Sequence, residues 1–383
     1  MPDPLHVPPA DPHANYLAHK EEIDRAVTRA LDSGRYILGP EVVAFEQEFA
    51  RYVGVAETIG VGSGTDAIHL ALRTLGVGPG DGVLTVSLTA VATVAAIDLA
   101  GAEPVLVDID PKTFTIDARL LEAAITAHRG PRLKAIVPVH LYGHPADMRA
   151  IVDLAKRHGL FVVEDCAQAH GAAVGPNKAG TWGDIACFSF YPTKNLGALG
   201  DAGAIVTDNL EWAARARALR QYGWRQRYIS DLAGMNTRLD EIQAAILRAK
   251  LPHLDRENAR RREIAARYDA ALGSTPLALP RVAQDVTHVY HQYTVRTPYR
   301  DELADFLAKG GIGAAILYPF PVHVQAAYRE RLLAAPAGLP ESERACRELL
   351  CLPVHPQLTD SQVAEVGERV VAWCETTVDR VPL

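Results

Sequence analysis

The fold is decided by a stretch near the middle of the chain, which reads Ser189-Phe190-Tyr191-Pro192-Thr193-Lys194-Asn195-Leu196-Gly197. The apolar run 185–190 is typical of a buried strand, and a second short apolar run, 204–206, follows the glycines. Because burial penalises a charged ammonium, a lysine just after a buried strand needs a partner or a chemical task. One such task is a Schiff base with an aldehyde cofactor. A solvated lysine in a loop is the alternative.

A second apolar run, farther upstream, ends in a carboxylate. It reads Phe161-Val162-Val163-Glu164-Asp165-Cys166-Ala167-Gln168-Ala169-His170-Gly171. Asp165 stands at the carboxyl end of a predicted strand, where open α/β sheets bind their ligands. A carboxylate at that place can keep a cofactor ring nitrogen protonated. A helix-capping aspartate is the alternative, which the small residues around Asp165 and the Asp-x-x-Gln spacing disfavour.

A glycine-rich segment, Gly60-Val61-Gly62-Ser63-Gly64-Thr65-Asp66-Ala67, fits the pattern of a dinucleotide-binding loop. That interpretation needs an acidic residue at the end of the next strand, and the run 83–87 has none. The segment instead indicates an anion site, because a helix that begins near Thr65 points its free N–H groups at a phosphate. A plain tight turn is the alternative.

Apolar runs and amphipathic stretches alternate along the first two thirds of the chain. Strands are predicted at 83–86, 104–107, 135–139, 160–164, 185–190 and 204–206, and helices at 65–75, 90–100, 117–128 and 147–158. The alternation predicts an α/β fold with a mostly parallel sheet, and Asp117 and Asp147 are predicted N-caps. A basic helical stretch over 238–272 is expected to lead into a smaller C-terminal α/β domain, and its basic residues at 256–262 are most simply an exposed helix face. The division predicted is a large domain at 1–245 and a small one at 246–383, with an extended arm in the first dozen residues.

Composition excludes several classes of partner. The 383 residues are 48% hydrophobic, so they can bury a large core, and the net charge of −7 gives no reason to expect nucleic acid or an anionic membrane. The first residues, MPDPLHVPPADPH, lack the basic and apolar regions of a signal peptide, and no apolar run reaches the roughly 18 residues of a membrane span. A cytoplasmic protein is therefore expected. Its five cysteines lack metal-type spacing, so we expect reduced, buried thiols and no metal site.

Taken together, these segments resemble the DegT/DnrJ/EryC1/StrS family of PLP-dependent sugar aminotransferases of fold type I. The resemblance covers nearly the whole chain. The segments that carry it, in the order of the family, are 33–50, 60–72, 137–148, 162–172, 188–208, 234–247 and 318–328. It implies an aspartate-aminotransferase-like fold, with a large PLP-binding domain and a smaller C-terminal domain.

The resemblance assigns roles to the residues of the first three motifs. Lys194 would bind pyridoxal 5′-phosphate, Asp165 would face its pyridine nitrogen, and Gln168 would lie near the ring and its 3′-oxygen. The implied phosphate contacts are Gly64, Thr65, the Asp66 amide and the Ser189 hydroxyl. A glutamine satisfied within the core is the alternative for Gln168.

Residues from later segments are implied at a dimer interface and at the substrate. Asn236 resembles the asparagine that reaches the phosphate of the neighbouring chain's cofactor, which implies a homodimer with active sites at the interface. Asn236 or Thr237 as a helix cap is the alternative. His323 would lie close to the sugar nucleotide. The aromatic and basic loop with Tyr222, Trp224 and Arg225 would suit a base and pyrophosphate, and a structural histidine and a solvated loop are the alternatives.

Two departures from the family pattern affect the expected cofactor site. The family usually presents an aromatic residue or a histidine that stacks on the cofactor ring, where this chain reads Ser87-Leu88-Thr89-Ala90-Val91-Ala92. Either Leu88 packs on the ring or the stacking partner comes from elsewhere. The N-terminal arm also differs, with prolines around Asp11 in place of an aromatic residue and a leucine.

The resemblance implies an aminotransferase that moves an amino group from an amino acid, L-glutamate by family habit, to a keto sugar. The sugar expected is a nucleotide-linked (dTDP) 3- or 4-keto-6-deoxyhexose in amino-sugar biosynthesis. Lys194 would move protons, and Asp165 would maintain the electron sink. Lys194 argues against the sister group that carries histidine there and removes hydroxyl groups. Two alternatives stay open: an aminotransferase for a cyclitol or other cyclic ketone, and a regulatory protein that holds PLP without turnover.

Overall fold

The computed structural model describes residues 7–335 and 337–377 of the chain. Its centre is an eight-stranded sheet with the strand order β1-β9-β8-β5-β4-β2-β3-β14. The strands are β1 (Glu57–Val61), β2 (Asp81–Val86), β3 (Glu103–Val107), β4 (Arg132–Ile136), β5 (Phe161–Asp165), β8 (Ile185–Ser189), β9 (Gly203–Thr207) and β14 (Leu333–Ala334). All neighbours are parallel except those of β9, which is antiparallel to β1 and β8. The predicted α/β fold with a mostly parallel sheet is confirmed.

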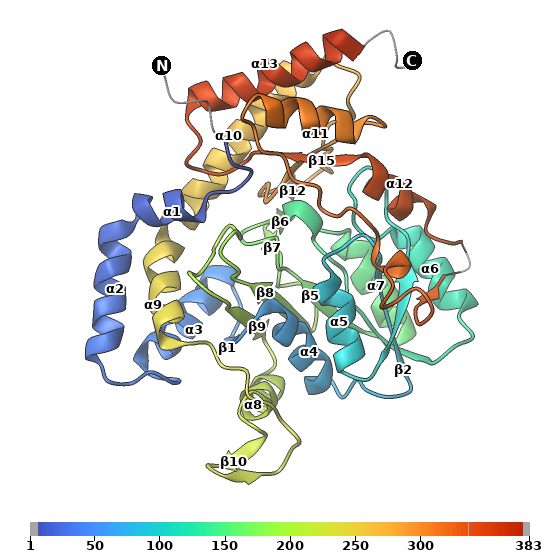
Figure 1. Cartoon of the computed structure of the whole chain (residues 1–383). Helices are drawn as coiled ribbons and strands as arrows, with labels where there is room; N and C mark the ends of the chain where they lie inside the picture. The colour runs from blue at the N-terminus through green and yellow to red at the C-terminus, as the bar shows by residue number, and fades with distance from the viewer. Residues whose placement is uncertain (1–6, 336, 378–383) are drawn as a thin grey trace.

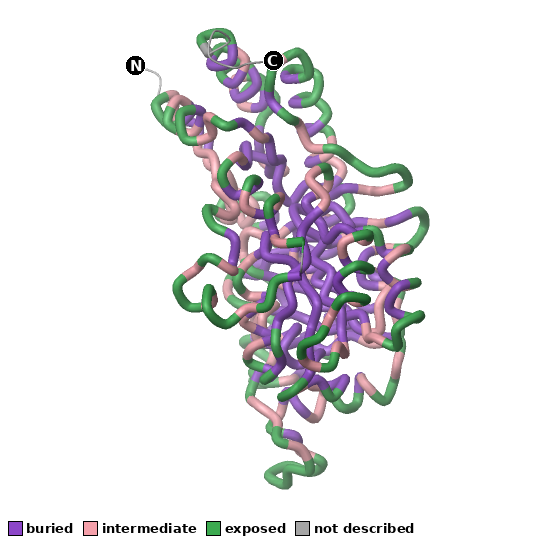
Figure 2. The backbone as a smooth tube through the Cα atoms, turned by 90° about the vertical axis from the view of Figure 1, so that its right-hand side faces the viewer, coloured by how far each residue is buried: buried purple, intermediate pink, exposed green. Residues whose placement is uncertain are grey.

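Helices cover both faces of this sheet (Figure 1). Alternate residues of β2 point to opposite cores: Val83 joins the cluster under α4, α5 and α8, and Leu84 joins the cluster under α6 and α7. These helices are α4 (Gly64–Thr74), α5 (Val91–Leu99), α6 (Ala118–Ala127), α7 (Met148–His158) and α8 (Leu210–Leu219). Figure 2 shows the buried backbone as a continuous column through the middle of the molecule. A sheet covered on both faces explains why its strands are apolar throughout.

The expected elements appear at their places, with ends that differ by a few residues. Asp117 and Asp147 cap α6 and α7, accepting hydrogen bonds from the amides of Arg119 (2.8 Å) and Ala150 (3.2 Å). The sheet also contains β1, which is absent from the predicted strands. Its sequence, ETIGV, is short and contains a glycine, so it gives a weak strand signal.

The N-terminal region forms three helices beside the sheet, α1 (Pro12–Ala18), α2 (Lys20–Asp32) and α3 (Pro40–Val53). The N-terminus of α3 is capped by a carboxylate from a distant segment of the chain. Glu241, which is buried, accepts hydrogen bonds from the amides of Gly39 (2.6 Å), Glu41 (3.0 Å) and Val42 (3.0 Å). Of the predicted arm, residues 1–6 lie outside the described residues, and Val7 is buried in a parallel bridge with Ile312.

The basic stretch 238–272 forms two helices rather than one. They are α9 (Glu241–Lys250) and α10 (Leu254–Leu272), with the 3-10 turn η2 (Leu251–His253) between them. Pro252 lies in that turn, and its missing N–H explains the break. The prediction that the arginines of 256–262 form an exposed face is wrong for Arg261. Its buried guanidinium donates to the carbonyl oxygens of Tyr290 and Val354.

The C-terminal part of the chain forms a second cluster of helices at the top of Figure 1. Here α10, α11 (Arg300–Lys309) and α13 (Asp360–Thr377) enclose a core with β13 (Tyr293–Arg296) and β15 (Leu349–Leu352), which pair antiparallel. Two strands of this part nevertheless pair with earlier strands: β12 (Val286–Thr287) with β6 (Ala173–Val174), and β14 with β3. The division at 245 and 246 therefore stays a prediction.

The remaining elements are small. They are α12 (Pro340–Glu348), η1 (Leu141–Gly143), η3 (Val322–Val324), β7 (Asn177–Lys178), and the hairpin β10 (Trp224–Gln226) and β11 (Ile229–Ser230). Figure 1 shows this hairpin projecting beyond α8, away from the C-terminal helices. The five cysteines are free and buried, as predicted. Within 7–335 and 337–377, no helix combines the length and the hydropathy needed to cross a bilayer.

Candidate functional site

The candidate site lies at the edge of the sheet where the carboxyl ends of its parallel strands meet. Because β9 runs antiparallel to both β1 and β8, the carboxyl ends of β1, β2, β4, β5 and β8 meet at one edge. A cavity of about 220 Å³ opens there. Its lining contains six of the predicted site residues, Gly64, Thr65, Asp165, Gln168, Ser189 and Lys194. Segments far apart in sequence thus converge, as the pattern of polar residues after apolar runs predicts.

Lys194 lies in a tight loop that follows β8. Its amide donates to the carbonyl of Tyr191 (2.8 Å), and the amide of Ala198 donates to Phe190 (2.8 Å). Gly197 is required in this loop, since a Cβ there would clash with the carbonyl of Pro192. Burial lowers the pKa of the Lys194 amine to about 8, and the Asp165 charge opposes that shift. Lys194 is half-buried and lines the cavity, so it does not project freely into solvent as the alternative interpretation requires.

Asp165 ends β5, is 5% exposed, and is held by two donors. Its Oδ2 accepts from the hydroxyl of Thr93 (2.8 Å), and its Oδ1 accepts from the amide of Ala167 (3.1 Å). Burial raises the pKa of this carboxyl, while the two hydrogen bonds and the charge of Lys194 favour the ionised form. Asp165 does not cap a helix, so it is available to a ligand in the cavity.

The glycine-rich segment forms the N-terminus of α4 at the same cavity. The N-cap is Ser63, whose Oγ accepts from the Asp66 amide (3.1 Å). Gly64 packs tightly on the end of β8, because an added Cβ would lie 2.6 Å from the Cβ of Ser189. The first N–H groups of a helix lack acceptors within the helix, so those of Gly64 and Thr65 suit an anion.

Asp66 differs from its predicted role. Its amide is already bonded to Ser63, and its carboxylate accepts from the hydroxyl of Thr237 (2.8 Å). Asp66 is not part of the cavity lining. Thr237 also accepts from the Gly62 amide (2.9 Å), so it joins the loop before α9 to the glycine-rich segment.

Gln168 lines the cavity and is held by two partners. Its Oε1 accepts from the amide of Tyr142 (2.7 Å), and its Nε2 donates to the hydroxyl of Tyr318 (3.1 Å). The side-chain amide is therefore fixed in one orientation, and it connects the cavity to the segment that contains Tyr318. This arrangement combines the two predicted roles, since Gln168 is satisfied by the protein and also faces the cavity.

Leu88 does not form a wall of the cavity. It is fully buried in the core under α6 and α7, and the cavity is lined instead by Thr89, Ala90, Ala92 and Thr93. The suggestion that Leu88 packs on a cofactor ring is therefore wrong. The segment after β2 presents small and hydroxyl side chains at this position.

The other predicted site residues lie outside the cavity of their own chain. Asn236 is exposed and forms a bridge with Gln221, and neither Asn236 nor Thr237 caps α9, whose N-cap residue is Asp240. His323 is held by its own chain, with Nδ1 2.8 Å from the Ser87 hydroxyl and Nε2 3.3 Å from Glu343.

The predicted nucleotide-binding loop is at the projecting hairpin, beyond α8 (Figure 1). Tyr222 precedes the hairpin, and Trp224 and Arg225 belong to β10. Trp224 and Arg225 line a shallow surface hollow with other aromatic and basic side chains, among them Tyr228 and Arg238. Within one chain the hairpin contributes no residue to the cavity beside Lys194.

Two threonines that the sequence analysis did not single out also belong to the candidate site. Thr89 and Thr93 line the cavity, and Thr93 bonds directly to Asp165. A threonine near a helix N-terminus is ordinarily a local cap, so the sequence gives no signal for a partner on another strand. Tyr191 and Asp201 also line the cavity and were not predicted.

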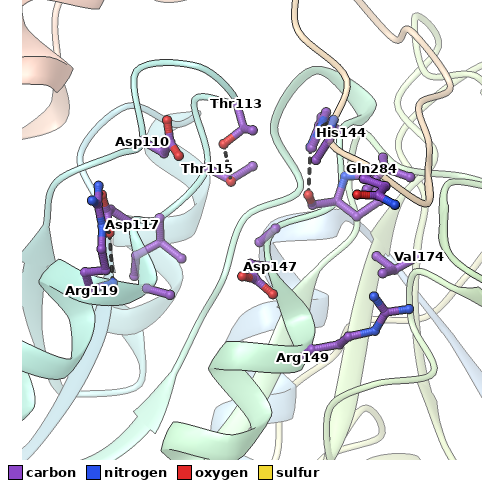
Figure 3. A pocket seen from close by; sticks show the side chains of 16 residues that line it. Asp110, Thr113, Thr115, Asp117, Arg119, His144, Asp147, Arg149, Val174 and Gln284 are labelled. Carbon is purple, nitrogen blue, oxygen red and sulfur yellow. Dashed lines mark hydrogen bonds and ion pairs between the residues drawn. The ribbon is translucent and has the colours of Figure 1, made fainter.

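A second cavity, of about 410 Å³, lies between the N-termini of α6 and α7 and strand β12. Figure 3 shows that several of its polar side chains are engaged with their own neighbours: Arg119 is paired with Asp117, and the hydroxyls of Thr113 and Thr115 share a hydrogen bond. His144 has Nδ1 2.7 Å from the carbonyl of Pro145, and its Nε2 accepts from the Ala283 amide (3.1 Å). No lysine lines this cavity, so its size does not make it the reactive site.

The chain matches known proteins over nearly its whole length. The model of the DegT/DnrJ/EryC1/StrS aminotransferase family matches residues 18–371. The chain is 48% identical, over 96% of its length and 96% of the relative's, to dTDP-3-amino-3,4,6-trideoxy-alpha-D-glucose transaminase of Streptomyces venezuelae.

Two solved structures have the same fold. The crystal structure of DesV from S. venezuelae has a TM-score of 0.93 at 47% identity and covers 98% of this chain and 100% of its own. NtdA from Bacillus subtilis, solved with the cofactor PMP bound, has a TM-score of 0.86 at 31% identity, covering 94% of this chain and 82% of its own.

Proposed function

The chain belongs to the DegT/DnrJ/EryC1/StrS aminotransferase family, and from this premise we propose that it transfers an amino group to carbon 3 of a dTDP-linked keto-6-deoxyhexose. It is a PLP-dependent aminotransferase that acts on keto sugar nucleotides. The name of the S. venezuelae relative specifies a dTDP sugar with its amino group at carbon 3. The observation that carries the proposal is the cavity that joins Lys194, Asp165 and the N-terminus of α4.

The residues of this cavity fit pyridoxal 5′-phosphate. An amine with a lowered pKa can form an imine with the aldehyde, and a buried carboxylate can pair with the protonated pyridine nitrogen. The free amides of a helix N-terminus can bind the phosphate. Lys194 would hold the aldehyde carbon, and Asp165 would hold the ring nitrogen. The phosphate would meet the amides of Gly64 and Thr65 and the hydroxyls of Thr65 and Ser189. When bound, the cofactor supplies a ring that accepts the electron pair of the bond broken at the substrate carbon.

The proton transfers of the reaction are assigned to Lys194. Its Nζ would take the proton from the α-carbon of the amino acid in the first half-reaction. In the second half-reaction it gives a proton to the carbon of the sugar that carried the keto oxygen. A pKa of about 8 suits both the uptake and the release of a proton, because the neutral and the protonated amine are both well populated near neutral pH. Asp165, ionised, keeps the proton on the ring nitrogen throughout.

The experiment that tests this function follows the cofactor through both half-reactions. L-Glutamate should remove the absorbance band of the lysine-bound cofactor and release 2-oxoglutarate, and a dTDP-3-keto-6-deoxyhexose should restore the band. The 4-keto isomer and a cyclitol ketone are run in parallel. Restoration by the cyclitol ketone alone would contradict the proposed substrate. No response to any amino donor would favour a protein that holds PLP without turnover.

The pKa of Lys194 predicts a pH dependence for capture of the cofactor. Only the neutral amine attacks an aldehyde, so the rate should rise with pH and level off above about 8, not near the ordinary lysine value of 10.5. Stopped-flow absorbance of the apoprotein mixed with pyridoxal 5′-phosphate measures this rate. A rate that still climbs steeply between about pH 9 and 10, roughly one pH unit or more above the expected plateau, would contradict the lowered pKa.

We also propose that the enzyme is a homodimer in which Asn236 completes the site of the neighbouring chain. Its exposure supports this, as does the position of the hairpin outside the cavity of its own chain. The test co-expresses Lys194→Ala chains and Asn236→Ala chains, and it isolates the hybrid dimers by a different affinity tag on each chain. One site of each hybrid then combines Lys194 of one chain with Asn236 of the other, and this site should have the wild-type rate. The same hybrids would stay as impaired as their parents if Asn236 acted within its own chain.

The cellular compartment that we propose is the cytoplasm. Five free, buried thiols support it, because disulfides are rare where the redox environment is reducing. A nucleotide-linked sugar and an amino-acid donor are both compatible with that compartment.

A further inference from the structure

The carboxylate of Asp165 is the end of a chain of buried hydroxyl groups. Thr93, in the first turn of α5, lies with its Oγ1 2.8 Å from Asp165 Oδ2. Thr89, just before that helix, lies with its Oγ1 2.9 Å from the Oγ1 of Thr93. Thr93 is 0% exposed and Thr89 is 3% exposed, so both hydroxyls are removed from bulk water although they border the cavity.

The direction of these hydrogen bonds follows from the number of protons. An ionised carboxylate only accepts, so the single hydroxyl proton of Thr93 must be directed at Asp165. The Oγ1 of Thr93 can then only accept from Thr89, whose own proton completes the chain. Donation to Thr93 polarises its O–H bond, which strengthens the bond that it makes to the carboxylate.

These contacts determine which lone pairs of the Asp165 carboxylate remain open to a ligand. Thr93 occupies one lone-pair direction of Oδ2, and the Ala167 amide occupies one of Oδ1. The carboxyl plane is therefore fixed from two sides. Burial alone would favour the neutral acid at this position, and the two donors act in the opposite direction.

We propose that Thr93 is a positioning residue of this enzyme, which holds the Asp165 carboxylate ionised and turned toward the cofactor ring nitrogen, and that Thr89 orients its hydroxyl. The inference rests on the proposed function, because it concerns the same cofactor site. It assigns a task to the segment after β2, where family members usually place an aromatic residue or a histidine.

Two substitutions of Thr93 separate the effect of its hydroxyl group from the effect of its packing. Thr93→Val keeps the shape of the side chain and removes the donor, whereas Thr93→Ser keeps the donor and removes a methyl group. Thr85→Val is the matched control, since Thr85 is a fully buried threonine on β2 whose hydroxyl donates to the carbonyl of Val137 (2.9 Å), away from the cavity.

The first readout is binding of pyridoxal 5′-phosphate to the apoprotein, measured by fluorescence titration. A hydrogen bond to a charged group is strong, so Thr93→Val should weaken binding roughly tenfold to a hundredfold. The second readout is the single-turnover rate with L-glutamate, which should fall in the same variant. Thr93→Ser and Thr85→Val should stay within about threefold of the wild type in both, a range that matches the usual effect of small packing changes.

Other outcomes would overturn the proposal. If Thr93 served only to fill space, Ser would be the damaging substitution and Val would behave as the wild type. If Thr93→Val and Thr85→Val lost cofactor affinity and single-turnover rate to the same extent, the effect would belong to any buried threonine hydroxyl in this part of the sheet and not to the bond with Asp165. A wild type that binds the cofactor but does not respond to any amino donor would instead contradict the proposed function, and the binding readout of Thr93 would still stand.

Discussion

Replacing Lys194 by alanine is expected to lower the rate of amino transfer by at least about a hundredfold to ten-thousandfold, the range that a positioned acid–base group contributes. The side chain would be lost as the covalent anchor of the cofactor and as the group that moves the proton at the substrate carbon. The cavity itself should remain, because the loop is held by backbone hydrogen bonds and by Gly197. Phosphate-driven binding of the cofactor should therefore persist without the absorbance band of the lysine-bound form.

A buried lysine elsewhere in the chain provides the control for this prediction. Lys250 also has a pKa lowered to about 8 by burial, and its Nζ donates to the carbonyl of Gly197 in the same loop (2.5 Å). Lys250→Met should still capture the cofactor covalently, as borohydride reduction and peptide mass mapping would show. Covalent cofactor on Lys250 in the Lys194→Ala protein would contradict the assignment of Lys194.

Replacing Asp165 by asparagine is expected to slow the half-reaction with L-glutamate roughly a hundredfold to a thousandfold, as removal of one preorganised electrostatic partner does. Asparagine keeps the size of the side chain but cannot hold a proton on the ring nitrogen, so the electron sink is weakened. The amine of Lys194 should remain reactive toward the aldehyde, and the absorbance band should form. Single-turnover absorbance with saturating L-glutamate measures the effect.

The control for Asp165 is Asp184, a partly buried carboxyl at the entry to β8. Burial raises the pKa of Asp184 as well, and its Oδ2 accepts from the amide of Val162 (2.8 Å), away from the cavity. Asp184→Asn should affect stability and leave the half-reaction near the wild-type rate. A half-reaction that is equally fast in Asp165→Asn and in the wild type would show that this carboxylate does not serve the ring nitrogen.

The sequence identifies the centre of the site because its residues follow strands directly. Lys194 and Asp165 come after apolar runs of adjacent parallel strands, so the strand pattern alone places them at one edge. The glycine-rich segment is recognisable for a similar reason, since helix N-termini bind anions through backbone groups that any sequence carries.

The parts that could not be predicted depend on contacts between distant side chains. Thr93 and Asp165 are 72 positions apart, and nothing in the local pattern connects them. Leu88 was a candidate for the cofactor ring because it is apolar, yet it packs in the core under α6 and α7, while Ala90 lines the cavity. Arg261 was placed on an exposed face, since a basic helical run does not show which of its members will be covered by a later segment.

The residues expected at the sugar nucleotide illustrate a further limit. His323 is held by Ser87 and Glu343 of its own chain, and Trp224 lies on the hairpin of β10 and β11, outside the cavity that Lys194 lines. A single chain does not bring them to the cavity, and a motif in sequence does not state which copy of the chain it serves. Their role in substrate binding stays a prediction.

The most direct test of the central claim is transfer of an isotopic label through the purified enzyme. L-Glutamate carrying heavy nitrogen in its amino group is incubated with the holoenzyme and a dTDP-3-keto-6-deoxyhexose, and the nucleotide sugars are analysed by mass spectrometry. We expect a dTDP-amino sugar that contains the heavy nitrogen, formed by the wild type and not by Lys194→Ala. Release of 2-oxoglutarate without label in any nucleotide sugar, under conditions where a cyclitol ketone takes up the label, would contradict it.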